Sequence, residues 1–280
     1  MRIKITADST CDLSPELIRD LEVEIVPLYV IEDDASYRDG VGYSPDNIFR
    51  HFEKTGRLCK TAAVNVSDYA EIFDRLSKEY DAVIHLNISL DFSSCYQNAY
   101  LAAQEFSNVY VVDSRNLSTG IGLLVIRAVE MARSGMQPQD IVHELAILTE
   151  KVEASFIIDT LTYLQKGGRC SSVAAFGASL LHLKPCIEVR DGKMSVGKKF
   201  RGSFEKACVS YVRDRLEGRT DIDTSRIFIT HTCTDSAPVE LVRQQVLRYG
   251  DFKEILITKA GCTVSSHCGP NTLGILFLRQ

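Results

Sequence analysis

Short apolar runs alternate with longer, polar-capped stretches along the first half of the chain. The apolar runs predict strands at residues 3–7, 24–30, 82–87 and 109–112. Helices are predicted from residue 14, from residue 44 through His51, and at 67–79, 94–106, 117–134 and 138–152. Ser14 and Ser44 each precede a proline and Ser67 precedes an acidic residue, which is typical of helix starts. Because strands linked through helices form right-handed crossovers, this half predicts a mostly parallel sheet between two helix layers.

The second half has a different pattern. Strands are predicted at 154–164 (strand to turn), 226–230, 254–258 and 272–278, and helices at 172–183, 204–217 and 238–249. Residues 186–190 and 193–198 flank Asp191-Gly192, a strong signal for a hairpin turn. A hairpin beside crossover units favours a mixed sheet. We therefore predict two α/β domains, a three-layer N-terminal domain at 1–153 and a C-terminal domain with a mixed sheet at 154–280.

Composition narrows the class of protein. The chain has 280 residues, 45% of them hydrophobic, and a net charge of −5. That length suffices for a substantial core, and the negative charge disfavours bulk binding to nucleic acid. No apolar run approaches the roughly 18 residues of a membrane span. The start, from Met1 to Ile5, enters a predicted strand without a signal-peptide pattern. We expect a cytoplasmic protein without stable membrane insertion.

Nine cysteines are scattered singly, without a Cys-x-x-Cys pair. Free, mostly buried thiols are the simplest interpretation in a cytosolic protein. Cys262 and Cys268 flank His267, but their spacing matches no common zinc pattern, so we expect no metal site. A thiol-linked or metal-linked regulator acting through these two cysteines stays open as an alternative.

Hydroxyl groups and one histidine gather in three segments that we predict to be loops. These segments contain Thr61, then Ser93 and Ser94, and finally His267 behind two serines. Hydroxyls and an imidazole without a metal cluster favour a small anion, with a carboxylate as the leading candidate. Simpler roles are also available, because a serine before a helix often caps it and a histidine often has an ordinary partner.

Other polar segments are weaker candidates. Asp8 and Asp113 follow predicted strands, where ligands of open parallel sheets bind, but they could equally fix turns. Gly167-Gly168-Arg169 forms a turn whose arginine either pairs across the domains or serves the site. Lys198-Lys199-Phe200-Arg201 is a basic strand end that is either solvated or a docking surface.

Standard enzyme motifs are missing from the sequence. There is no P-loop, no Gly-x-Ser-x-Gly elbow, and the dinucleotide-binding fingerprint fails at Val125, where its third glycine belongs. Nucleophilic catalysis by Ser93 and His267 is thus weakly supported. A stand-alone small-molecule hydrolase using this pair remains the alternative.

The chain resembles the DegV family of bacterial fatty-acid-binding proteins over nearly its whole length. The motifs that carry the resemblance are Ile5 to Leu13, Val26-Pro27-Leu28 with Tyr37-Arg38-Asp39, Lys60-Thr61-Ala62, Ile88 to Ala99, Asp159 to Arg169 and His267-Cys268-Gly269-Pro270. The chain departs from the family pattern at Ala62, Ser94, Cys95, Cys268 and Asn271.

The resemblance implies one long-chain fatty acid bound between the two domains. Its carboxylate would contact Thr61, Ser93, Ser94 and His267, with Arg169 nearby. Its acyl chain would run into a tunnel in the second domain, which Phe176, Leu180 and Leu181 would line.

The resemblance also implies a carrier that is not catalytic alone and needs no cofactor. A separate ATP-binding subunit of a fatty acid kinase would phosphorylate the presented carboxylate to an acyl phosphate for phospholipid synthesis. Arg201 matches the position that engages this partner.

Overall fold

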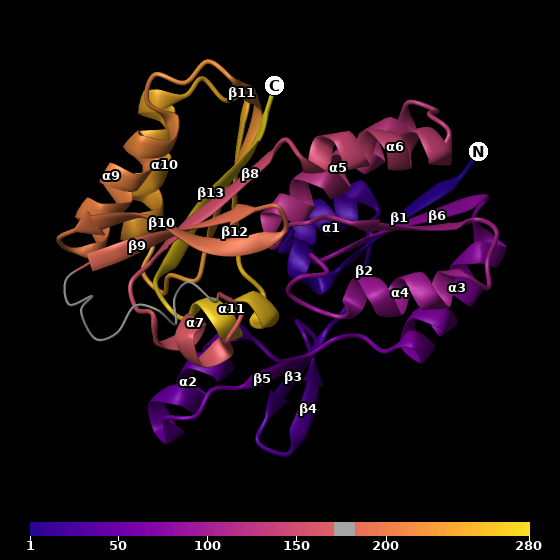
Figure 1. Cartoon of the computed structure of the whole chain (residues 1–280), viewed down its shortest axis with the longest axis horizontal. Coiled ribbons are helices and arrows are strands. Elements are labelled where there is room, and N and C mark those ends of the chain that lie inside the picture. Colours follow the sequence, from indigo (N-terminus) through magenta and orange to yellow (C-terminus); the bar gives the residue numbers. More distant parts are fainter. Residues whose placement is uncertain (171–182) are drawn as a thin grey trace.

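The computed structural model describes residues 1–170 and 183–280 (Figure 1). The predicted helix at 172–183 falls almost entirely outside these residues, and so do Phe176, Leu180 and Leu181. The last residue of that predicted helix, Leu183, is instead the first residue of a strand.

A four-stranded parallel sheet forms the N-terminal half, as predicted. Its strands, in spatial order, are β2 (Glu24–Val26), β1 (Ile3–Asp8), β6 (Ala82–Asn87) and β7 (Val109–Asp113). Helices α3 (Val66–Glu79) and α4 (Cys95–Ala103) lie on one side of this sheet, and α5 (Thr119–Arg133) and α6 (Pro138–Thr149) lie on the other (Figure 1). A short 3-10 turn (Ser9–Cys11) and α1 (Pro15–Leu21) follow β1. Every residue of β6 is buried, as expected for a central parallel strand.

The start signals of the helices were only partly correct. Ser14 caps α1 by accepting a hydrogen bond from the Leu17 N–H. Ser44 forms a capping box with Asn47 at the start of α2 (Pro45–Thr55). Ser67 is not a cap, because Asn65 caps α3 by accepting from the Asp68 N–H and Ser67 donates to the Asn65 side chain.

A small antiparallel sheet in the N-terminal half was not predicted. It contains β4 (Ala35–Arg38), β3 (Tyr29–Glu32) and β5 (Lys60–Ala62). The single strand predicted at 24–30 is in fact two strands, β2 and β3, which belong to different sheets. Pro27 lies between them and has no N–H to donate to a ladder, which explains the break. The segment of Thr61, predicted to be a loop, is β5.

The C-terminal half contains the predicted mixed sheet, in six strands. In spatial order they are β10 (Lys193–Arg201), β9 (Leu183–Arg190), β8 (Val152–Ile158), β13 (Thr272–Arg279), β11 (Ile222–His231) and β12 (Glu254–Lys259). Only the β11–β12 pair of this sheet is parallel. The predicted hairpin is confirmed, with Asp191 and Gly192 both at positive φ in its turn.

Four helices accompany this sheet. Helices α9 (Phe204–Leu216) and α10 (Ala237–Tyr249) cover one face (Figure 1). Two short helices, α7 (Thr162–Gly167) and α11 (Cys262–Cys268), lie beside α2 and were not predicted (Figure 1).

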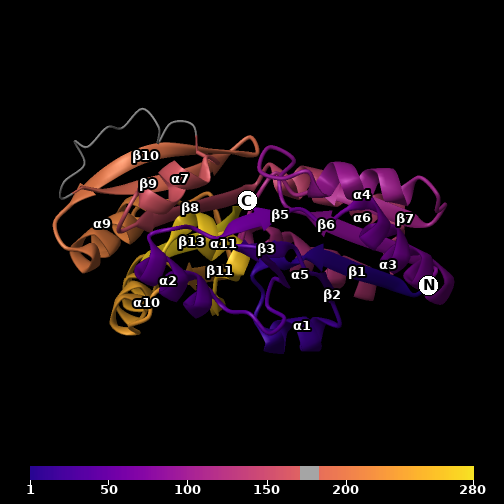
Figure 2. The same ribbon diagram turned by 90° about the horizontal axis from the view of Figure 1, so that it is seen from below.

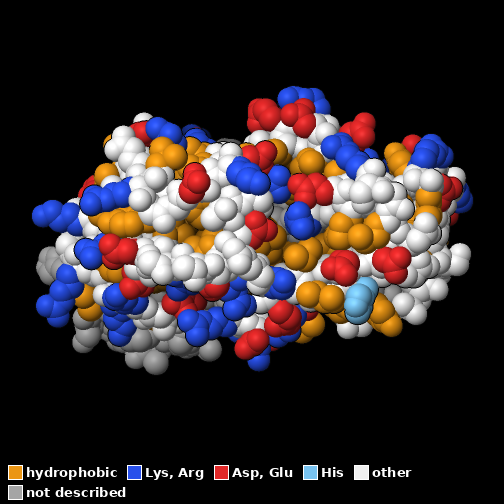
Figure 3. Space-filling view, turned by 90° about the horizontal axis from the view of Figure 1, so that it is seen from above, with side chains coloured by type: hydrophobic (Ala, Val, Ile, Leu, Met, Phe, Trp, Pro, Cys, Tyr) orange, Lys and Arg blue, Asp and Glu red, His pale blue; other side chains and the backbone are white. Residues whose placement is uncertain are grey.

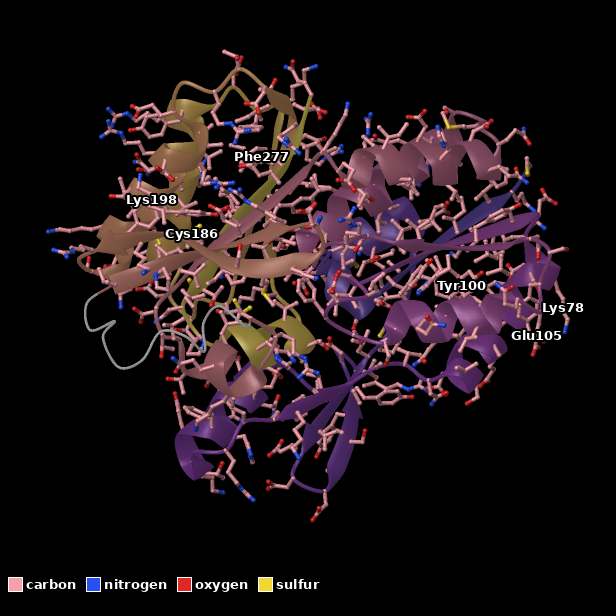
Figure 4. All side chains as sticks on the ribbon, in the orientation of Figure 1. Lys78, Tyr100, Glu105, Cys186, Lys198 and Phe277 are labelled. Atoms are coloured by element: carbon pink, nitrogen blue, oxygen red, sulfur yellow. The ribbon has the colours of Figure 1, made fainter. Side chains whose placement is uncertain are left out.

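Apolar packing connects the two halves. The face of the second sheet under α9 and α10 has its own cluster, to which Cys186 and Phe277 belong (Figure 4). The opposite face contributes Phe156, Phe228 and Leu276 to a larger cluster that also contains the core of the N-terminal half. One face of the second sheet therefore packs into the same core as the first sheet, and the domain boundary near residue 153 stays a prediction.

The surface shows no broad region of one charge in the view of Figure 3, where acidic and basic side chains are interspersed. Within residues 1–170 and 183–280, no helix combines the length and apolar character that crossing a membrane requires.

Candidate functional site

A cavity of about 120 Å³ lies where the two halves meet. It contains all five side chains that the sequence assigned to the head-group site, namely Thr61, Ser93, Ser94, Arg169 and His267. Its other lining residues are mostly apolar: Leu28, Ala62, Ala63, Ile88, Phe92, Leu117, Met194, Thr263, Val264 and Cys268. Segments far apart in sequence thus converge, and Figures 1 and 2 both place β5 beside α11. We call this space the head-group cavity.

Thr61 and His267 are hydrogen-bonded across the cavity wall, with 2.8 Å between Oγ1 and Nε2. Burial, and secondarily the positive charge of Arg169, lower the pKa of His267 to about 4. The imidazole is therefore neutral near pH 7. The prediction that His267 lies in a loop was wrong, because it belongs to the last turn of α11.

The ring orientation of His267 indicates which nitrogen carries its proton. Nδ1 is buried and has no hydrogen-bond partner in the part of the chain that the structure describes. It faces Gly167 so closely that a Cβ there would lie 2.6 Å away. Buried N–H groups without an acceptor are rarer than acceptors without a donor, so we assign the proton to Nε2. His267 then donates to Thr61, and the Thr61 O–H is free to donate into the cavity.

Ser93 lines the cavity from the loop of residues 88–94 between β6 and α4. Its hydroxyl donates to Cys95 Sγ at 3.2 Å and accepts from the Cys95 N–H at 3.3 Å. Burial, with a smaller contribution from Asp8, raises the pKa of the Cys95 thiol to about 12, so it stays protonated. Because sulfur is a weak acceptor, the Ser93 O–H can turn toward a better one. Ser94 precedes α4 but makes no side-chain capping bond.

Two buried carboxylates hold the N-terminal end of α11. Asp39 accepts from the N–H groups of Cys262 and Thr263, at 2.8 and 3.1 Å. Asp12 accepts from the Gly261 N–H at 2.8 Å and from the Ser118 hydroxyl at 2.5 Å. Burial raises the pKa of Asp12 to about 7, and neighbouring Asp39 adds to the rise. Sequence reasoning missed this role of both residues, since their partners are more than 200 positions away in the chain.

Thr263 is a lining residue that the sequence analysis also missed. It lies one helical turn before His267 and is 5% exposed. Its hydroxyl has no hydrogen-bond partner among the described residues. A buried hydroxyl in a cavity wall is available to a ligand or a water molecule.

Asp8 and Asp113 do not line the head-group cavity. Asp8 is fully buried and accepts from Tyr69, Asn87 and the Ile88 N–H, so it holds the end of β6 where the loop 88–94 begins. Asp113 accepts from the N–H groups of Leu90 and Arg115. Both aspartates fix turns, which was the simpler of their two predicted roles.

The two predicted arginines, Arg169 and Arg201, lie in different parts of the molecule. Arg169 lines the cavity, and its guanidinium donates to the Gly167 carbonyl at 2.9 Å. Arg201 ends β10 on the surface and is not among the cavity residues.

Neither alternative function gains support from the structure, neither a hydrolase that uses Ser93 and His267 nor a regulator that acts through Cys262 and Cys268. His267 pairs with Thr61 and Ser93 with Cys95, so the nucleophile–base contact that a hydrolase needs is not formed. Burial raises the pKa of Cys262 and of Cys268 to about 12, which keeps both thiols protonated. No group of three or more His, Cys, Asp or Glu residues suited to a metal occurs within 1–170 and 183–280.

Comparison with known proteins places the chain in a family. The model of the DegV family, whose description calls it uncharacterised, matches residues 2–280. A DegV domain-containing protein of Deinococcus radiodurans is 31% identical, with 98% of each chain covered. A DegV family protein of Thermus thermophilus, described by its fatty acid binding, has a structure that is 34% identical with a TM-score of 0.91 over 100% of both chains. DegV of Bacillus subtilis, described as a fatty acid binding protein, is 26% identical with a TM-score of 0.86, again over 100% of both chains. The chain therefore belongs to the DegV family.

Proposed function

We propose that this protein binds a long-chain fatty acid and holds its carboxylate in the head-group cavity. The observation that carries the proposal is the convergence of Thr61, Ser93 and His267 on one small cavity with otherwise mostly apolar walls. Two similar structures, from Thermus thermophilus and Bacillus subtilis, are described as binding fatty acids, which supports the ligand class.

The polar groups of the cavity suit a carboxylate. The hydroxyls of Thr61 and Ser93 can each donate to a carboxylate oxygen, and the unpartnered hydroxyl of Thr263 offers a further donor. Neutral His267 holds the Thr61 oxygen, so that the Thr61 proton points toward the ligand. Arg169 supplies positive charge nearby, and Ser94 completes the polar wall.

The acyl chain must extend beyond the head-group cavity. A volume of about 120 Å³ is well below the roughly 300–1,000 Å³ of typical ligand sites, so it suits the carboxylate and the first carbons. Phe92, Leu117 and Met194 line the apolar part of the wall. We assign the rest of the path to the second domain; the lining residues expected from the resemblance, Phe176, Leu180 and Leu181, lie outside the described residues. Burying about 16 carbons at ~0.8 kcal/mol per CH₂ supplies roughly ten kcal/mol before the costs of binding.

The protein would present this carboxylate to a separate ATP-binding subunit of a fatty acid kinase. A carboxylate oxygen would attack the terminal phosphorus of ATP, giving an acyl phosphate and ADP, and the acyl phosphate would enter phospholipid synthesis. The chain has no P-loop, which supports a partner that supplies the nucleotide. Exposed Arg201, at the end of β10, is the proposed docking residue.

Native mass spectrometry of the purified protein, followed by titration with C14–C18 fatty acids, tests the binding. Thr61→Val removes the donor and keeps the shape, so we expect about tenfold weaker binding, whereas Thr61→Ser keeps the donor and most of the affinity. A protein that binds none of these acids, or that treats both variants alike, contradicts the proposal. For the kinase step, the loaded protein with ATP and a kinase subunit should yield acyl phosphate. Formation of that product without the subunit would contradict the carrier role.

A further inference from the structure

The turn of the β9–β10 hairpin contacts the loop that carries Ser93. The Ser89 hydroxyl donates to the Gly192 carbonyl at 2.8 Å. Two ion pairs flank this bond, Lys193 with Asp91 at 3.7 Å and Arg115 with Asp191 at 3.5 Å. Figure 2 shows the turn end of β10 beside the segment that leads into α4. The C-terminal half therefore holds a loop of the N-terminal half through its hairpin turn.

Ser89 organises the loop from within. Its carbonyl accepts from the N–H groups of Phe92 and Ser93, at 2.9 and 3.3 Å. Its hydroxyl accepts from the Asp91 N–H at 3.3 Å, and its own N–H donates to the Asn116 carbonyl at 2.9 Å. Ser89 is fully buried and does not line the head-group cavity. Any displacement of Ser89 is thus passed directly to the backbone of Ser93.

Gly192 fits against Ser89 only because it has no side chain. A Cβ at this position would lie 2.8 Å from Ser89 Oγ and 3.2 Å from Asp91 Oδ2. Gly192 also has φ +78°, a conformation that favours glycine. Met194, two residues further along β10, lines the head-group cavity. The same hairpin therefore both lines the cavity through Met194 and contacts the loop that carries Ser93.

We propose that Ser89 and Gly192 form a positioning pair, in which the hairpin turn of the C-terminal half sets where the Ser93 hydroxyl stands in the head-group cavity. Neither residue touches the ligand. The proposal rests on the proposed function, because the effect of this pair is measured as a change in fatty acid affinity. It adds that the C-terminal half controls a polar contact supplied by the N-terminal half.

A pair of glycine variants separates positioning from backbone strain. Gly192→Ala and Gly218→Ala both place alanine at a positive φ, +78° and +73°, but nothing lies within 4 Å of a Cβ at Gly218. Both variants should lose stability in urea unfolding through backbone strain, and Gly192→Ala should lose more because its Cβ also meets Ser89 Oγ and Asp91 Oδ2. In palmitic acid titrations we expect only Gly192→Ala to weaken binding, by about tenfold. Equal affinities for the two variants would overturn the proposal.

A rescue experiment and a ligand-free measurement complete the test. Ser89→Ala removes the oxygen with which the new Cβ collides, so the Ser89→Ala/Gly192→Ala double variant should bind palmitic acid more tightly than Gly192→Ala alone. A double variant that binds no better contradicts the pair. Without ligand, Gly192→Ala should shift the Phe92 and Ser93 amide resonances, and Gly218→Ala should not. If the resonances shift but the protein binds no fatty acid, the proposed function is refuted and the positioning by Ser89 and Gly192 is supported. If the resonances do not shift, the positioning is overturned.

Discussion

The two walls of the head-group cavity are held in place by different physics. The α11 wall, which carries Thr263 and His267, is fixed by two buried carboxylates at the start of a seven-residue helix. The Ser93 wall is fixed mainly by backbone groups and the hydroxyl of Ser89. The start of α11 is therefore held directly by carboxylates, whereas Ser93 itself is held by neutral groups, and carboxylates act only on the earlier loop residues Ile88 and Leu90.

The difference has consequences for how each wall responds to its surroundings. The hydrogen bonds that a buried carboxylate accepts change in strength when it is protonated, whereas a hydroxyl does not titrate in the physiological range. The low pKa of His267 removes the imidazole as a pH-sensitive group near pH 7. Changes in pH should thus act on the α11 wall through Asp12 and on the start of the Ser93 loop through Asp113, whose pKa burial also raises.

The largest effect is expected from Asp39→Ala. The variant leaves the buried N–H groups of Cys262 and Thr263 without their acceptor, which should cost about 3 kcal/mol of unfolding free energy. Ser89→Ala, on the other wall, should cost only about 1 kcal/mol, because a neutral hydroxyl is lost. Urea unfolding measures both values, with exposed Asp34→Ala as the control. Equal losses for Asp39→Ala and Ser89→Ala would remove the distinction between the walls.

Asp12→Asn should change the pH dependence of stability. Since burial raises the pKa of Asp12 from 3.8 to about 7, the folded protein keeps a proton that the unfolded chain has already released between these values. Stability contributed by the protonated group is therefore lost as pH rises from about 4 to 7. An asparagine at this position can keep the contacts with Gly261 and Ser118 and does not titrate.

The stability advantage of Asp12→Asn over the unsubstituted protein should grow across that range and level off above pH 7. At pH 8 we expect the free energy of unfolding of Asp12→Asn to exceed that of the unsubstituted protein by at least about 1.4 kcal/mol, which corresponds to a pKa shift of one unit. The groups around Asp12 are Asp39, Cys11 and Cys268, and the two thiols stay neutral because burial holds their pKa near 12. Thermal unfolding at several pH values measures the difference. A difference independent of pH between 4.5 and 8 would show that Asp12 does not titrate in this way.

The smallest effect is expected from Thr263→Val. The change removes an unpartnered buried hydroxyl and keeps the shape, so stability should be unchanged or slightly improved. Fatty acid binding should weaken by about threefold, as expected when one of several donors is lost. Ser93→Ala is the matching variant on the other wall, and calorimetric titration compares the two. Unchanged affinity in Thr263→Val would assign its hydroxyl to a water molecule rather than to the ligand.

Most strands and long helices could be predicted because their signals are local. Apolar runs marked β1, β6 and β7, and the Asp-Gly turn identified the hairpin of β9 and β10. The small sheet was missed because β3, β4 and β5 are only three or four residues long. Their pairing depends on contacts with distant segments rather than on their own pattern.

The five predicted polar side chains do line one cavity, but Thr263 and the elements that position these residues were missed. Cys262–Cys268 contains Thr, Val and Ser, which are weak helix formers, and the acceptor that completes its N-terminal end is Asp39. No local pattern connects positions so far apart. The partnership of Ser89 with Gly192 was hidden for the same reason, since 103 positions separate them.

The carboxylates that hold α11 also constrain how the protein is made. Asp12 and Asp39 emerge early from the ribosome, whereas their N–H donors at Gly261, Cys262 and Thr263 are synthesised more than 200 residues later. Until these donors have been synthesised, the two carboxylates can bind only their partners in the N-terminal half, Ser118 for Asp12 and Ser9 for Asp39. The α11 wall of the cavity can therefore form only after the C-terminal segment that contains Thr263 and His267 has been synthesised and has packed against the N-terminal half.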